Sequence, residues 1–272
     1  MGLILGLQCT HAGGLATSPE RLARLAELIT DARWHYTFKL INVGYISTSP
    51  RVPKFAGVIP RAKLQSAVLE ALSSASASHV YVGCSRMEVG NHASIQVELG
   101  RDILQPGDAQ HARGRWRVPD VADVEAAAAS WVELAHAMVE TMGAMHGVII
   151  TATDAYVMDA EISLVNTSID GQPMHPRQAE ITSYQVGRDT LGVKYIRRPR
   201  WGTYLKPAHV EAVGGRDKLL AVVKPPVVRE VGELLYVQLS ERIADATAPD
   251  TRTRYRAFCD LVAPIVMPPV PA

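Results

Sequence analysis

The segment 197–215 constrains its own local structure more tightly than any other stretch of the chain. Trp201 and Tyr204 bring large apolar rings with polar tips into a few residues. Pro207 suits the first turn of a helix, and the pair Gly214–Gly215 suits its end, where a left-handed residue is commonly needed. A helix of about two turns therefore fits between them. The segment contains no catalytic motif, so the pattern indicates a structural and recognition element.

The rest of the chain mixes helix and strand patterns without a sustained strand-helix-strand repeat. Asp120 is expected to cap the longest helix and Gly143 to end it. This mixture predicts an α+β fold, with mixed or mainly antiparallel sheets packed against several helices. Apolar spacing predicts helices over 61–74 and 121–142, and strands over 1–7, 38–46, 79–85, 94–99, 146–152 (a central strand) and 233–240.

A polar stretch rich in glycine, proline and arginine covers residues 105–119 and predicts a loop. We expect one α+β domain over residues 1–272, because a chain of this length buries a sizeable core and no internal repeat is visible. The alternative is two sub-lobes that meet near 105–119.

Composition limits the partners and the compartment. The formal net charge is +1, which leaves little long-range attraction to nucleic acid or to a membrane surface. The apolar N-terminal residues follow no basic region, so we expect neither a signal peptide nor a membrane span. Cys9, Cys84 and Cys259 lack CxxC spacing, which favours reduced thiols. We therefore expect a cytoplasmic protein.

Few residues form a recognisable catalytic pattern. Asp154, Asp159 and Glu161 cluster around one predicted strand pair, where acids either perform acid–base chemistry or form the exposed face of a half-buried strand. Cys84 ends an apolar strand pattern, which is more typical of a packed thiol than of a nucleophile. The nine histidines show no metal-ligand spacing, and phosphate-binding glycine motifs are absent. We expect no cofactor and no metal.

Two arginine clusters flank tryptophans. One surrounds Trp116 and includes Arg115; the other places Arg198 and Arg200 just before Trp201. Tryptophan, tyrosine and arginine often anchor protein interfaces, but the tryptophans are equally compatible with core positions beside solvated arginines. A nucleic-acid adaptor that stacks bases on the aromatic rings is a further alternative.

The C-terminal part of the chain resembles the type VI immunity family, bacterial proteins that neutralise a toxin delivered between competing cells. The resemblance covers about a third of the chain. Its parts, in order, are Val193–Ile196, the Trp-Gly-Thr-Tyr-Leu run at 201–205, the short helix ending in Gly214–Gly215, and the apolar strand at 234–239.

This resemblance implies a non-enzymatic protein that binds a cognate protein toxin stoichiometrically in the cytoplasm and occludes its active site. The composition argues against a membrane partner and disfavours a nucleic-acid partner, and a homo-oligomer stays open. The alternative functions are an enzyme that uses Asp154, Asp159 and Glu161, or the nucleic-acid adaptor. The candidate contact residues are Trp201, Tyr204, Arg198, Arg200, Trp116 and Arg115.

Overall fold

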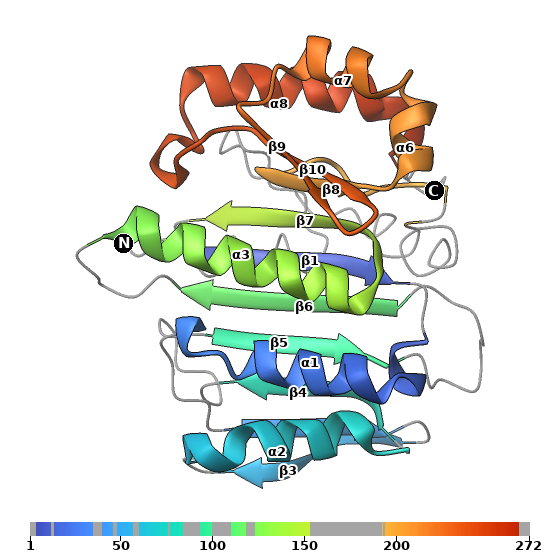
Figure 1. Cartoon of the computed structure of the whole chain (residues 1–272), viewed down its shortest axis with the longest axis vertical. Coiled ribbons are helices and arrows are strands. Elements are labelled where there is room, and N and C mark those ends of the chain that lie inside the picture. Colours follow the sequence, from blue (N-terminus) through green and yellow to red (C-terminus); the bar gives the residue numbers. More distant parts are fainter. Residues whose placement is uncertain are drawn as a thin grey trace.

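The computed structural model describes residues 4–11, 14–34, 40–45, 48–56, 60–75, 77–83, 93–99, 110–117, 123–152, 192 and 194–266. Its main feature is one ten-stranded sheet in the order β3-β2-β4-β5-β6-β1-β7-β8-β10-β9, with every pair of these strands antiparallel (Figure 1). The strands are β1 (Ile4–His11), β2 (Leu40–Tyr45), β3 (Thr48–Ala56), β4 (Ala77–Gly83), β5 (Ala93–Glu98), β6 (Gln110–Arg117), β7 (Ala144–Ala152), β8 (Gly202–Leu205), β9 (Val227–Val231) and β10 (Leu234–Gln238).

The first strand of the chain lies in the middle of the sheet, between β6 and β7, and is buried along its whole length. The expected central strand at 146–152 is confirmed as part of β7, which lies between β1 and β8. β9 forms one edge of the sheet. It directly follows Pro225–Pro226, and prolines are compatible with the start of an edge strand because they donate no hydrogen bond to a neighbour.

Capping residues mark both ends of the longest helix. Asp123, not the expected Asp120, caps the longest helix: its carboxylate accepts a hydrogen bond from the Ala126 amide at 2.9 Å. Gly143 ends that helix as predicted, with a left-handed φ of 58°. The expected helices after Pro207 and over 61–74 are also confirmed. The helices are α1 (Pro19–Ile29), α2 (Arg61–Ser73), α3 (Val124–Met142), α6 (Pro207–Ala212), α7 (Arg216–Val223) and α8 (Pro249–Val262).

Helices pack on both faces of the sheet. Tyr204 and Tyr236 belong to the main core, which includes the buried residues of α1, α2 and α3. The adjacent residues Leu205 and Leu235 belong to a second core with α7 and α8. Successive side chains of a strand point to opposite faces, so the C-terminal helices cover the face of β8 and β10 opposite to α3. Figure 1 shows these helices at one end of the sheet, with α1 to α3 along its length.

The predicted loop at 105–119 is wrong for most of its length, because residues 110–117 form strand β6 between β5 and β1. Ala112, Gly114 and Trp116 alternate along this strand and are buried. The sheet therefore passes through the point where two sub-lobes would have met.

Candidate functional site

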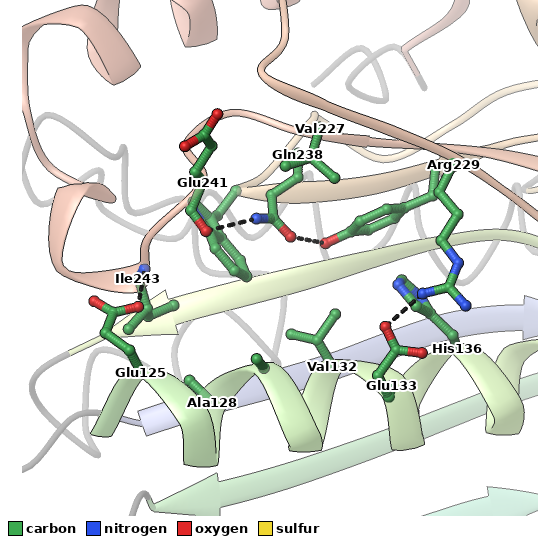
Figure 2. A pocket seen from close by; sticks show the side chains of 13 residues that line it. Glu125, Ala128, Val132, Glu133, His136, Val227, Arg229, Gln238, Glu241 and Ile243 are labelled. Atoms are coloured by element: carbon green, nitrogen blue, oxygen red, sulfur yellow. Dashed lines mark hydrogen bonds and ion pairs between the residues drawn. The ribbon is translucent and has the colours of Figure 1, made fainter. Parts of the chain in front are cut away.

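A groove of about 150 Å³ opens between α3 and the β9–β10 hairpin (Figure 2). The helix contributes one long face to it, and the hairpin and the residues after it contribute the opposite wall. Its lining residues are Glu125, Ala128, Ala129, Val132, Glu133, His136, Trp201, Val227, Arg229, Tyr236, Gln238, Glu241 and Ile243.

Hydrogen bonds hold the polar part of the groove floor in place. The Tyr236 hydroxyl donates to Gln238 Oε1 at 2.8 Å, and Gln238 Nε2 donates to the Ser240 carbonyl at 2.7 Å. The Trp201 ring donates from Nε1 to Ser240 Oγ at 2.7 Å, and that hydroxyl donates to the Arg242 carbonyl at 2.8 Å. Because each side chain is tied to the next, the floor is preorganised before any ligand binds.

His136 lines the groove from α3 and is only 5% exposed. Its Nδ1 shares a hydrogen bond of 2.7 Å with the Tyr204 hydroxyl, and its ring packs edge-on against Tyr236 with centroids 4.5 Å apart. Burial lowers the pKa of His136 to about 4; nearby Glu133 opposes this shift and Arg229 adds to it. The imidazole is therefore neutral at pH 7. Its Nε2 has no hydrogen-bond partner among the described residues.

Charged side chains border the groove. Glu133 on α3 forms an ion pair with Arg229 on β9, and both side chains are about half exposed (Figure 2). Glu125 lies on the same helix, eight residues closer to its N-terminus. It accepts hydrogen bonds from the Ile243 and Ala244 amides at 2.9 Å each. The first pair links α3 to the hairpin, whereas the second links α3 to the segment after it.

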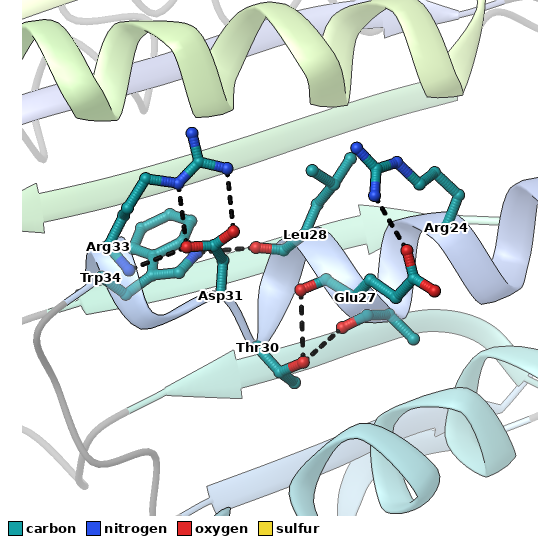
Figure 3. A network of polar contacts seen from close by, with 8 residues as sticks. Arg24, Glu27, Leu28, Thr30, Asp31, Arg33 and Trp34 are labelled. Atoms are coloured by element: carbon teal, nitrogen blue, oxygen red, sulfur yellow. Dashed lines mark hydrogen bonds and ion pairs between the residues drawn. The ribbon is translucent and has the colours of Figure 1, made fainter.

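All three aromatic residues predicted as partner contacts are buried. Trp116 belongs to the main core, where its ring stacks on Trp131 with centroids 6.1 Å apart and donates to the Trp34 carbonyl at 2.8 Å. Trp34 itself follows α1 and donates to the Leu28 carbonyl at 2.9 Å (Figure 3). Tyr204 is fully buried. Burial removes Trp116 and Tyr204 from reach of a partner that binds this conformation.

The remaining predicted contacts do not gather at one place. Trp201 is 3% exposed but lines the groove. Arg200 is buried and donates to the Tyr255 hydroxyl at 3.3 Å, whereas Arg198 is exposed. Arg115 lies in β6, and its side chain is outside what the structure describes. Among the predicted contacts whose side chains the structure describes, Trp201 alone lines the groove.

The proposed catalytic acids Asp154, Asp159 and Glu161 lie outside the described residues, as does Cys84. Within the described ranges, no three His, Cys, Asp or Glu side chains are grouped closely enough to hold a metal ion. The helices in those ranges also lack the combination of length and apolar character that crossing a membrane requires.

Sequence reasoning missed Glu125, Glu133 and His136 as parts of one site. Their spacing along α3, eight residues and then three, places them on one side of the helix, which is a detectable signal. His136 has no second histidine or cysteine at metal-ligand spacing, so the sequence gives no signal that it belongs to a site. The opposite wall of the groove, from Arg229 to Ile243, is about a hundred residues away from α3 in sequence. No local pattern in it predicts that it lies next to this helix.

The comparison with solved structures finds proteins of similar fold. The chain resembles the solved structure of the T6SS (type VI secretion system) protein PA0821 of Pseudomonas aeruginosa, with a TM-score of 0.61 and 13% sequence identity over 97% of this chain and 73% of that one. No protein-family model and no curated protein matches. At this level of identity the similarity shows a shared fold.

Proposed function

We propose that this protein is a non-enzymatic immunity protein, which binds a protein toxin of a type VI secretion system in the cytoplasm of the cell that produces it. The observation that carries the proposal is the fold-wide similarity to a protein of that system. Fold alone does not specify function, so the proposal also needs a plausible binding surface.

The groove between α3 and the β9–β10 hairpin supplies such a surface. It combines a hydrogen-bonded aromatic floor with charged residues around it, which is the usual organisation of a protein interface with an apolar centre and a polar rim. Bound across this groove, the protein would sterically block the active site of the toxin. Neither partner has to change conformation, because occlusion needs only a rigid scaffold and slow dissociation of the complex.

The test has two steps. A tagged form of the full chain is used to recover a partner from the source bacterium, and the recovered protein is then expressed in a heterologous host with and without the chain. We expect growth arrest without the chain and normal growth with it. Calorimetry should give a 1:1 complex with a Kd below about 10 nM, equivalent to roughly −11 kcal/mol.

Two results would refute this function. One is a recovered partner that does not impair growth. The other is continued toxicity when the chain is co-expressed at equal or higher levels, verified by immunoblotting, because a stoichiometric inhibitor must protect under that condition.

A further inference from the structure

Strand β9 forms an edge of the sheet at which a further strand can pair. It is the last strand in the sheet order, and within the described ranges β10 is the one strand that pairs with it (Figure 1). Arg229 and Glu230 in its middle are exposed. An edge strand has backbone N–H and C=O groups on its outer side that no neighbouring strand satisfies.

The hairpin turn determines which backbone groups of β9 face outward. A two-residue turn separates Val231 from Leu234, and these two residues are opposite each other. In such a hairpin the pair next to the turn is hydrogen-bonded, and bonded and non-bonded pairs then alternate along the strands. The N–H and C=O groups of Arg229 and Val231 therefore point toward β10. Those of Val228 and Glu230 point away from it.

Prolines are placed differently at the two edges of the sheet. β3, at the opposite edge, contains Pro50 and Pro53 within the strand. Because proline has no N–H to donate, prolines inside an edge strand protect it from pairing with another chain. Pro225 and Pro226 instead precede β9, and every residue of β9 has an N–H. Of the two edges, β9 is therefore the one suited to accept another strand.

The two charged side chains in the middle of β9 already have counter-ions within the protein. Arg229 forms an ion pair with Glu133 on α3, and Glu230 accepts a hydrogen bond from Arg216 on α7 at 2.8 Å. Successive residues of a strand point to opposite faces, so one face of the edge has a cationic position and the other an anionic one. Their charges sum to zero and do not repel an incoming strand as a net charge would.

A second copy of this chain fits the edge poorly. A two-fold pairing that uses the outward groups of both Val228 and Glu230 places Arg229 directly opposite the same residue of the other copy. Centring the pairing on Glu230 places two glutamates opposite each other, and like charges in opposed positions destabilise a strand pair. Centring it on Val228 places Pro226, which has no N–H, opposite Glu230. The edge therefore favours a different chain.

We infer that the protein toxin adds an antiparallel strand to β9 and so extends the sheet. This inference rests on the proposed function above. The added strand would form four backbone hydrogen bonds with Val228 and Glu230, which is a common mode of peptide recognition. Since Val227 and Arg229 also line the groove, the added strand would lie beside it.

The charges of β9 specify part of the sequence of the added strand. An acidic residue is expected opposite Arg229, because a guanidinium has five N–H donors and can bind a second carboxylate besides Glu133. A basic residue is expected opposite Glu230. In an antiparallel strand this basic residue comes directly before the acidic one, so the toxin should contain a strand with a basic–acidic pair.

Amide hydrogen exchange, measured on the full chain alone and in the toxin complex, tests the inference. In the free protein we expect the amides of Val228 and Glu230 to exchange at least about tenfold faster than those of Arg229 and Val231, which bond to β10. In the complex, exchange at Val228 and Glu230 should slow by about tenfold or more, with little change at Arg229 and Val231.

Three results of this measurement would overturn the inference. Slow exchange at Val228 and Glu230 in the free protein at every concentration would mean that the chain covers its own edge. Protection that grows with protein concentration without toxin would mean that a second copy binds there. Unchanged exchange in the complex would mean that the toxin binds elsewhere. The immunity function is judged separately by protection of growth, so it can stand when this inference fails.

Substitutions on the edge test the same contact through the Kd of the toxin complex. Val228→Pro removes one outward N–H and should raise the Kd about tenfold, whereas Val228→Thr keeps this donor and should leave the Kd unchanged. Glu230→Lys places a cation opposite the expected basic residue and should also raise the Kd about tenfold. Its control is Glu233→Lys, the same charge change at an exposed position in the turn. Thermal unfolding shows whether each variant is folded.

Two outcomes of these substitutions contradict the inference. A Kd that Glu230→Lys leaves unchanged or lowers would exclude the expected basic residue. Equal losses of affinity in Glu230→Lys and Glu233→Lys would mean that the toxin senses only the overall charge of this region and does not pair with the edge of β9.

Discussion

At the scale of single residues, Tyr204 connects two buried histidines on different elements. Its hydroxyl contacts His136 Nδ1, while its backbone carbonyl accepts a 2.7 Å hydrogen bond from His146 Nδ1. His146 Nε2 in turn accepts from the Arg197 amide at 3.1 Å, which fixes its neutral tautomer. Burial is the main cause of a pKa of about 4 for His136 and about 3 for His146. Both imidazoles are therefore neutral in the folded protein at pH 7.

Because of these two histidines, we expect the free energy of unfolding to fall in acid. Their pKa is lower in the folded than in the unfolded state, so the unfolded chain binds more protons below pH 6.5 and stability falls as the pH falls through that window. From pH 7.5 to pH 5 the loss should be about 2 kcal/mol for each histidine. His136→Asn can keep a hydrogen bond to Tyr204 and should remove about half of the combined loss. Urea unfolding at several pH values measures both slopes; identical slopes would contradict the assignment.

The close packing around Gly202 leads to a second prediction at the scale of single residues. A Cβ atom placed there would lie 2.5 Å from the Tyr236 hydroxyl, so Gly202→Ala must displace the ring that forms part of the groove floor. We expect a loss of about 1–3 kcal/mol in the free energy of unfolding. Gly114→Ala is the matched control, because it is also a buried strand glycine and its Cβ would meet its nearest atom, Ile95 Cγ1, at 3.7 Å. Equal unfolding midpoints in urea for the two variants would refute the steric explanation.

At the scale of elements, sequence predicted those whose ends carry local signals. Pro207 and Gly143 identified a helix start and a helix end because the backbone conformations they favour are local properties. Strand β6 was missed because its buried residues, Ala112, Gly114 and Trp116, are few and alternate with polar side chains that resemble a loop. Its burial depends on neighbours far away in sequence, including the stacking of Trp116 on Trp131.

The groove could not be predicted from the sequence either, because its two walls come from segments that are far apart in the chain. One wall is a helix face whose spacing could have been recognised from Glu125, Glu133 and His136. The other wall reaches this helix only because β8 pairs with β7 and β10 pairs with β8. A pairing between strands separated by about fifty residues is not encoded in any local pattern. Trp201, predicted as a partner contact, lines the groove, although its ring is packed and not exposed.

Glu125 predicts how α3 is coupled to the segment that follows β10. Its carboxylate accepts from two successive amides with different oxygens, Oε2 from Ile243 and Oε1 from Ala244, and in glutamine one of these positions becomes an NH2 group, which cannot accept. Glu125→Gln should therefore accelerate hydrogen exchange at these two amides by about tenfold. Glu133→Gln is the control on the same helix, because the partner of Glu133 is the Arg229 side chain. Unchanged exchange at both amides in Glu125→Gln would show that other contacts hold the segment.

At the scale of the whole molecule, the two cores share strands. Tyr204 and Tyr236 contribute to the main core, while Leu205 and Leu235 on the same two strands contribute to the C-terminal core. A strand cannot unfold on one face and remain folded on the other. If residues 1–272 form one domain, as expected from the sequence, a substitution that destabilises the C-terminal core should destabilise the main core as well.

Phe258→Ala tests this coupling. Phe258 is fully buried in the C-terminal core, and its truncation should lower the free energy of unfolding by about 3–5 kcal/mol. All four tryptophans of the chain belong to the main core, so their fluorescence reports on the core that the substitution does not touch. If the molecule unfolds cooperatively, the fluorescence and far-UV circular dichroism midpoints in urea shift together by the same amount. A fluorescence midpoint that stays at the wild-type value, with an earlier separate step in circular dichroism, would mean that α6 to α8 unfold as an independent unit. Leu25→Ala in the main core provides the calibration, because it should shift both signals under either model of unfolding.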